Sequence, residues 1–164
     1  MSNSTTKKDP TLAFLLSHPA HFLGLGLGSG LSGFAPGTFG TLAAVPLWLL
    51  MAGQSLLLQC VIILVASVIG IYFCGKTASD LGSHDHGAIV WDEFVGFWIT
   101  MIAAPAGWLW VVIGFILFRL FDIWKPWPIR FFDKNVESGL GIMIDDVLAG
   151  IYALLVLQLI ALLT

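Results

Sequence analysis

Two pairs of adjacent carboxylates occur among the ten acidic residues of the chain: Asp92-Glu93 and Asp145-Asp146. Each pair directly precedes a segment that contains no charged residue. Neighbouring carboxylates repel each other, most strongly beside a low-dielectric region. A Mg²⁺ ion relieves this repulsion, and proteins hold it with one or two carboxylates, water and substrate phosphate oxygens. The pattern predicts a catalytic Mg²⁺ site made by these four side chains. The alternative is that each pair marks a helix N-terminus, where the helix dipole favours negative charge.

A third group of charged residues lies in the segment FRLFDIWKPWPIRFFDKN, residues 118–135. Asp122 and Lys125 are spaced i, i+3 and face the same way on a helix, and Arg119 reaches Asp122 from the preceding turn. Positive groups beside paired acids suit an anionic, metal-chelating substrate. We therefore predict that Lys125 and Arg130 bind a substrate phosphate and that Asp122 joins the catalytic carboxylates. In the alternative interpretation, these side chains only anchor the chain at a membrane interface.

The glycine-rich stretch GSGLSGFAPGT, residues 28–38, begins with the pattern G-x-G-x-x-G. It does not predict a dinucleotide site, because Pro36 follows closely and no acidic residue occurs about 20 positions later. A glycine-rich loop also lets backbone N–H groups approach an anion closely. We predict that the substrate phosphate is additionally bound by Gly28, Ser29, Gly30 and Thr38. Glycines that only permit close helix packing are the alternative.

The composition indicates an integral membrane protein. Of the 164 residues, 58% are hydrophobic and 10% are charged, whereas soluble domains carry about 25% charged residues. The net charge is −3 and no basic tail is present, so no nucleic acid partner is expected. The two cysteines, Cys60 and Cys74, lie in or beside an apolar run and are interpreted as packing residues.

Charged residues are confined to the stretches 7–9, 76–93 and 119–146, and the intervening blocks contain none. A charge at bilayer depth costs several kcal/mol, so the uncharged blocks are the candidate membrane segments. They predict a short apolar helix capped by Thr41, a span over residues 55–74 and a last membrane helix over residues 147–164.

The block 94–118 is interrupted by Pro105-Ala106-Gly107, a helix-breaking signal. If this turn and the one at residues 53–54 both lie away from the charged side, all charged stretches share one membrane face. That face would be cytoplasmic by the positive-inside rule. We therefore predict an all-α integral membrane protein with short or re-entrant hairpins and charged catalytic loops gathered on one face. A single crossing by 94–118, which would separate Glu93 from Arg119, is the alternative.

The histidines give weaker indications. His84 and His86 flank Asp85 in SHDHGA, and a transition-metal site can be drawn from them. A solvated loop before the next helix is the interpretation we prefer. His18 and His21 are expected to be interfacial residues.

Three long segments together resemble those of bacterial phosphatidylglycerophosphatase A: GLGSGLSGFAPGTFGTLAA, SHDHGAIVWDEFVGFWIT, and FRLFDIWKPWPIRFFDKN followed by GLGIMIDDVLAG. The resemblance covers residues 22–150 and implies a Mg²⁺-dependent, multi-pass lipid phosphatase of the bacterial inner membrane, with its active site on the cytoplasmic face. It implies conversion of phosphatidylglycerophosphate to phosphatidylglycerol and inorganic phosphate. One domain, 1–164, is expected, with an N-terminal interfacial segment over 1–21 ahead of the family-like core.

Other phosphatase chemistries lack their motifs. Neither cysteine begins C-x₅-R, and no D-x-D-x-[TV] pattern occurs. Metal-assisted hydrolysis remains, with attack by water preferred over a phosphoaspartate intermediate. Two rival functions are kept. A CDP-alcohol-type head-group transferase would carry D-G-x₂-A-R-x₈-G-x₃-D-x₃-D, which is missing, and an ion-coupled transporter would normally carry an acid in mid-span.

Overall fold

A computed structural model describes residues 9–83, 86–136 and 138–164. All regular elements within these ranges are helices, and no strand is found there. The chain opens with two short helices, α1 (Leu12–Ser17) and α2 (Pro19–Gly24), and a 3₁₀ segment, η1 (Gly26–Leu31). The all-α prediction is confirmed for the described part of the chain.

The first hairpin joins α3 (Pro36–Met51) to α4 (Leu56–Leu81). Ser55 caps α4, because its hydroxyl accepts a hydrogen bond from the Leu58 N–H at 3.3 Å. Thr41 does not cap α3, so that prediction is wrong. The helix begins at Pro36, whose missing N–H is harmless in a first turn, and the Thr41 hydroxyl donates to the Gly37 carbonyl inside the helix.

The second hairpin joins α5 (Trp91–Thr100) to α6 (Trp108–Trp124) through residues 101–107. Pro105 cannot donate a backbone hydrogen bond, and Gly107 adopts φ 122°, a conformation that side chains disfavour. Both features end the helical path. Glu93 and Arg119, at the two ends of this block, come within 3.7 Å of each other. The hairpin prediction is confirmed, and the single-crossing alternative is wrong.

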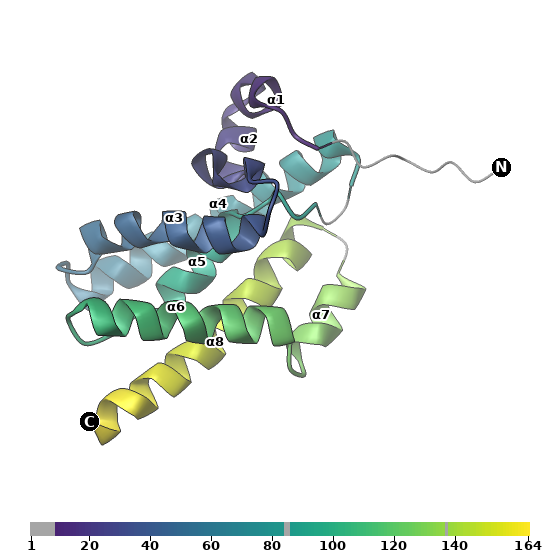
Figure 1. Ribbon diagram of the computed structural model, residues 1–164. Helices are drawn as coiled ribbons and strands as arrows, with labels where there is room; N and C mark the ends of the chain where they lie inside the picture. The colour runs from purple at the N-terminus through teal and green to yellow at the C-terminus, as the bar shows by residue number, and fades with distance from the viewer. Residues whose placement is uncertain (1–8, 84–85, 137) are drawn as a thin grey trace.

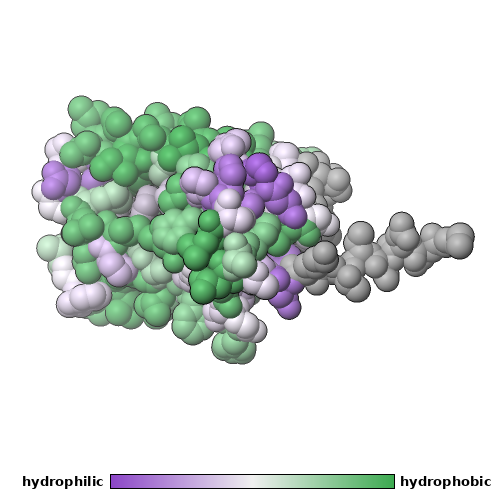
Figure 2. All heavy atoms as spheres, turned by 90° about the horizontal axis from the view of Figure 1, so that it is seen from above, coloured by the Kyte–Doolittle hydropathy of each residue, from purple (hydrophilic) through white to green (hydrophobic). Residues whose placement is uncertain are grey.

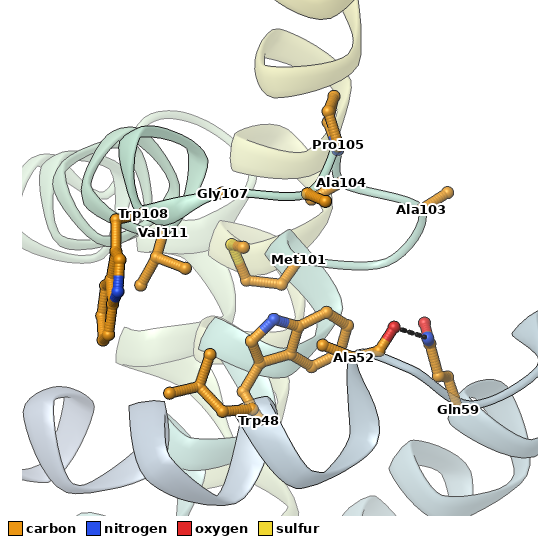
Figure 3. A pocket seen from close by; sticks show the side chains of 12 residues that line it. Trp48, Ala52, Gln59, Met101, Ala103, Ala104, Pro105, Gly107, Trp108 and Val111 are labelled. Atoms are coloured by element: carbon orange, nitrogen blue, oxygen red, sulfur yellow. Dashed lines mark hydrogen bonds between the residues drawn. The ribbon is translucent and has the colours of Figure 1, made fainter.

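The turns of both hairpins lie at the same end of the molecule (Figure 1). A cavity of about 250 Å³ separates them, and Trp48, Gln59 and Val111 are among its lining residues (Figure 3). The Gln59 side-chain amide donates to carbonyls at the end of α3 and in the turn that follows it, the shortest of these bonds being 3.1 Å to Gln54. These hydrogen bonds stabilise the turn between α3 and α4. The charged segments lie at the end of the hairpins opposite this turn.

The last helix is α8 (Gly139–Leu163), preceded by the short α7 (Ile129–Asn135). The predicted start at residue 147 is therefore wrong. Ser138 caps the helix, since its hydroxyl accepts from the Gly141 N–H at 3.4 Å. The acidic pair lies inside the helix rather than before it, and both aspartates are buried within the protein.

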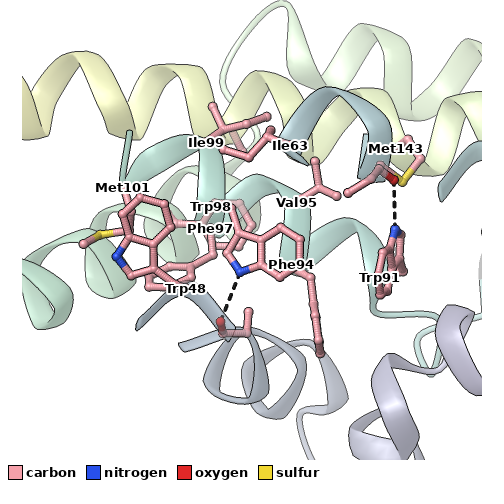
Figure 4. Packing of buried hydrophobic residues seen from close by; sticks show 14 of the residues in the cluster. Trp48, Ile63, Trp91, Phe94, Val95, Phe97, Trp98, Ile99, Met101 and Met143 are labelled. Atoms are coloured by element: carbon pink, nitrogen blue, oxygen red, sulfur yellow. Dashed lines mark hydrogen bonds between the residues drawn. The ribbon is translucent and has the colours of Figure 1, made fainter. Parts of the chain in front are cut away.

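Helix α5 forms the centre of the fold, and all ten of its residues are buried. Its aromatic side chains pack among α3, α4 and α8 (Figure 4). The indole N–H groups of Trp91 and Trp98 donate to the carbonyls of Ala66 and Ala44, each at 3.1 Å. These bonds satisfy the polar atoms of the core.

Close contact between α5 and α8 depends on two glycines. A Cβ on Gly150 would lie 2.5 Å from the Gly96 carbonyl oxygen, and a Cβ on Gly96 would lie 2.8 Å from the Asp146 carbonyl oxygen. Gly96 follows Asp92 by four residues, and Gly150 follows Asp146 by four, so each glycine lies one turn from an acid on the same helix face. The contact therefore brings the two acidic pairs together.

Helices α4 and α8 are long and apolar enough to cross a membrane, with 26 and 25 residues. Only 22% and 28% of their most apolar windows are buried. Figure 2 shows apolar side chains over most of the face seen from above, with hydrophilic ones gathered mainly toward one end. This surface suits a helical membrane protein whose apolar sides face lipid.

Candidate active site

Three carboxylates form a compact cluster between α5 and α8. Asp92 and Glu93 occupy the first turn of α5, and Asp146 comes from the second turn of α8. One oxygen of each lies within 4.8 Å of the others. All three residues are at most 9% exposed. Sequence reasoning predicted these residues as ligands of one metal site, and the structure brings them together.

The cluster opens into a cavity of about 120 Å³. Six carboxylates line it against one lysine: Asp92, Glu93, Asp122, Asp133, Asp145, Asp146 and Lys125. Asp122, predicted as catalytic, is therefore in place. Asp133 was not predicted as a site residue, although it lies eight residues after Lys125 in the same charged segment.

Asp145 differs from its neighbour Asp146 in what it contacts. Its Oδ2 lies 2.5 Å from the Lys125 ammonium nitrogen, which also lies 2.5 Å from Asp133 Oδ1. Burial opposes the positive charge of Lys125, but the carboxylates of Asp145 and Asp133 outweigh that cost and raise its pKa. The lysine therefore stays protonated beside the cavity. Asp145 is its counter-ion and lies outside the three-carboxylate cluster.

Arg119 is a site residue that the prediction did not include. Its Nη1 lies 2.5 Å from Asp122 Oδ2, the i, i+3 contact that the sequence suggested, and 3.7 Å from Glu93 Oε1. The side chain is 15% exposed, and its Nε and Nη1 have no hydrogen bond of good geometry within the described chain. Arg119 is not among the residues that line the cavity, and it contacts the site through the carboxylates of Asp122 and Glu93.

Several buried carboxylate oxygens at the site have no hydrogen-bond partner among the described residues: Asp92 Oδ1, Glu93 Oε2, Asp145 Oδ1 and Asp146 Oδ2. Unpaired buried oxygens of this kind are costly unless a ligand satisfies them. Hard divalent cations with oxygen ligands meet this need, and Mg²⁺ commonly binds through a few carboxylates while sharing phosphate oxygens. The donor set therefore fits the predicted Mg²⁺.

The first part of the glycine-rich stretch, residues 28–30, does not line the carboxylate cavity. Gly28, Ser29 and Gly30 lie in η1, where the Ser29 hydroxyl donates to the Gly26 carbonyl. A Cβ on Gly30 would lie 1.9 Å from the Ala88 carbonyl oxygen, so this glycine permits close packing. The structure supports the packing alternative for this part of the stretch.

The end of the stretch comes nearer to the site. A Cβ on Gly37 would lie 2.3 Å from Glu93 Oε1 and 3.1 Å from the Arg119 guanidinium. Thr38 is half-buried beside it in the first turn of α3. Arg130 is exposed on α7 and does not line the cavity.

Two histidines differ from expectation. His86 is 7% exposed, so it does not belong to a solvated loop; His84 and Asp85 lie outside the described residues. His21 is buried rather than interfacial. Its Nε2 lies 2.7 Å from Asp80 on α4, and its ring stacks on Phe14. The contact of His21 with Asp80 joins residues 59 positions apart in the chain, so the local sequence does not reveal it.

The comparisons with known proteins agree on one family. A model described as "PgpA: Phosphatidylglycerophosphatase A" matches residues 22–161. Phosphatidylglycerophosphatase A of Escherichia coli (strain K12) is 54% identical over 83% of this chain and 80% of its own length. The Haemophilus influenzae protein of the same name is 49% identical, with 92% and 94% covered.

A third relative is a Bacteroides thetaiotaomicron protein with the provisional name phosphatidylinositol-3-phosphatase. It is 41% identical over 82% of this chain and 89% of its own length. No solved structure gives a significant match.

Proposed function

Because this chain belongs to the phosphatidylglycerophosphatase A family, we propose that its carboxylate cavity hydrolyses the phosphate monoester of phosphatidylglycerophosphate with the help of Mg²⁺. The products are phosphatidylglycerol and inorganic phosphate. The chain is thus an enzyme of phosphatidylglycerol synthesis, a phosphoric monoester hydrolase. The observation that carries the proposed site is the cluster of Asp92, Glu93 and Asp146, beside a lysine that faces the same cavity.

Each side chain of the cavity has a distinct task. Asp92, Glu93 and Asp146 would hold Mg²⁺, which when bound polarises the phosphoryl group and activates water. Lys125 presents its ammonium group to the phosphoryl oxygens, and Asp145 and Asp133 fix its position. Arg119 pairs with Asp122 and lies near Glu93, and its positive charge would offset the negative charge of these two carboxylates, which line the cavity. Water is the proposed nucleophile.

The membrane arrangement suits a lipid substrate. The carboxylates and the lysine that line the cavity come from the start of α5, the end of α6 and the segment that follows it, and the first half of α8, so the cavity lies at the end of the second hairpin opposite its turn. We infer a multi-pass protein of the bacterial inner membrane with this end on the cytoplasmic side, as the positive-inside rule favours. A phospholipid can then present its head group to the cavity while its acyl chains remain in the bilayer.

Phosphate release from phosphatidylglycerophosphate by detergent-purified protein tests the proposal. We expect turnover with Mg²⁺, none with EDTA, and at least a 100-fold loss in Asp92→Asn and Asp146→Asn. Asp80→Asn is the matched control, because Asp80 pairs with Lys76 and His21 away from the cavity. Full activity in EDTA or in both cluster variants would refute the Mg²⁺ site. Release of CMP from CDP-diacylglycerol would instead indicate a head-group transferase.

A further inference from the structure

A second cavity, of about 290 Å³, adjoins the carboxylate cavity, and Gly87 lines both. The remaining wall consists of small or apolar residues from η1, the start of α3 and the segment before α5, together with Asp9 and Pro10 near the N-terminus. Neither the proposed mechanism nor the family comparison gives this cavity a role. Its polar groups therefore indicate what it can bind.

His86 presents a free hydrogen-bond donor to the second cavity. The Ala88 N–H donates to His86 Nδ1 at 3.2 Å, so Nδ1 is the acceptor and the ring proton of the neutral imidazole is on Nε2. The residue is 7% exposed, and its Nε2 has no hydrogen-bond partner within the described chain. A buried N–H without an acceptor is costly, which indicates that a ligand supplies the acceptor.

Asp9 lies opposite the His86 Nε2–H donor, and its carboxylate restricts which chemical group can bind between them. Its Oδ1 is 4.0 Å from His86 Nε2, too far for a direct hydrogen bond. A single hydroxyl oxygen between them can accept from Nε2 and donate to the carboxylate. No Lys or Arg is found among the described residues that line this cavity, so an anionic group would face the Asp9 carboxylate without a cation to offset the repulsion. A neutral hydroxyl fits better than a phosphate.

We propose that the second cavity binds the free hydroxyl of the substrate's glycerol head group and selects for a hydroxylated head group. The inference rests on the proposed function: Gly87 lines both cavities, so a head group whose terminal phosphate occupies the carboxylate cavity can extend its glycerol into the second one. Inositol, in the name of the 41% identical relative, is also a polyol. His86 and Asp9 are therefore specificity-determining residues that contact the substrate.

The test compares two lipids in enzyme variants. One is phosphatidylglycerophosphate, and the other carries propane-1,3-diol phosphate and lacks the free hydroxyl. We expect the wild-type enzyme to prefer the first by about tenfold in kcat/KM, the value of one such hydrogen bond. His86→Leu should lose about tenfold on the first lipid and little on the second. His86→Gln keeps an N–H donor and should retain part of the preference.

His18→Leu is the matched control, because His18 Nδ1 accepts from the Ala20 N–H in the same local pattern but does not line the cavity. It should leave the preference unchanged. An equal loss on both lipids in His86→Leu would overturn the proposal, since it would indicate a phosphodiester contact or a structural role. A wild-type enzyme without any preference would overturn it as well.

A binding measurement separates this inference from the proposed catalysis. Two lipids in mixed micelles are titrated into Asp92→Asn protein: phosphatidylglycerol, and the analogue with a propane-1,3-diol head group, which lacks only the central hydroxyl. This measurement needs no turnover. Weaker binding of the analogue, abolished when His86→Leu is added, supports the second cavity even if the hydrolysis assay fails. Equal affinities for the two lipids in this experiment would overturn the inference while leaving the proposed hydrolysis intact.

Discussion

Replacing Gly150 by alanine tests whether activity depends on the close approach of α5 and α8. The new Cβ would lie 2.5 Å from the Gly96 carbonyl oxygen and 3.1 Å from both the carbonyl carbon and the Cα of Gly96. Ordinary van der Waals contact for a Cβ begins at 3.4 Å, so the shortest distance is 0.9 Å too small. The obstructing atoms are backbone and cannot rotate away. The helices must therefore move apart by an appreciable fraction of an ångström.

This separation acts directly on the carboxylate cluster. Asp146 lies one turn before Gly150 on α8, and Asp92 lies one turn before Gly96 on α5. Overpacking of this kind costs about 1–3 kcal/mol in stability. A displacement near 1 Å in a catalytic constellation can lower the rate by about 100-fold. We expect Gly150→Ala to fold with reduced thermal stability and to lose most of its kcat.

The assay is Mg²⁺-dependent phosphate release, read together with a thermal melt of the same preparation. Gly53→Ala is the matched control, because nothing lies within 4 Å of a Cβ at that turn. Raising the Mg²⁺ concentration should recover part of the lost activity if the ligand spacing has widened. A Gly150→Ala enzyme with a lowered melting temperature but an unchanged kcat would refute the reasoning, since the cluster would then tolerate the displacement.

Three further predictions concern the cations and the topology. Arg119→Gln should lower kcat about tenfold to 100-fold, whereas Arg119→Lys should retain more activity because the charge is kept; equal losses would argue against a charge role. The pKa of Lys125 is raised in the folded protein, so its stabilising effect is complete below the unfolded-state pKa of about 10.4 and is lost as the pH rises through the folded value. The melting-temperature difference between wild type and Lys125→Met should therefore not decrease from about pH 6 to 9, and a difference that falls across that window would contradict the assignment. In a Cys60→Ser background, cysteines at the exposed positions Ser79 and Asp133 should react with an impermeant maleimide only from the cytoplasmic side; labelling from opposite sides would refute the shared face.

The partition of charge along the sequence by itself determined the membrane character and the two hairpins. Charges are too costly at bilayer depth to be placed freely, so their absence from long blocks fixes which segments are apolar helices. Pro105 and Gly107 then fix where the second hairpin turns. The acidic pairs also identified the candidate site. In each pair, one aspartate is followed four residues later by a glycine, and this Asp-x-x-x-Gly pattern indicates the close contact between α5 and α8.

The tertiary structure decided which partners, and therefore which role, each carboxylate of an acidic pair has. Asp145 and Asp146 are adjacent in the chain but about 100° apart around the helix, so one meets Lys125 and the other joins Asp92 and Glu93. Spacing along one segment cannot reveal that separation of partners. His21 likewise meets Asp80 across the fold, and the glycines of η1 pack against the segment before α5. The role of each of these residues depends on which distant backbone segment packs against it. The packing of the helices sets that contact, and the local sequence does not reveal it.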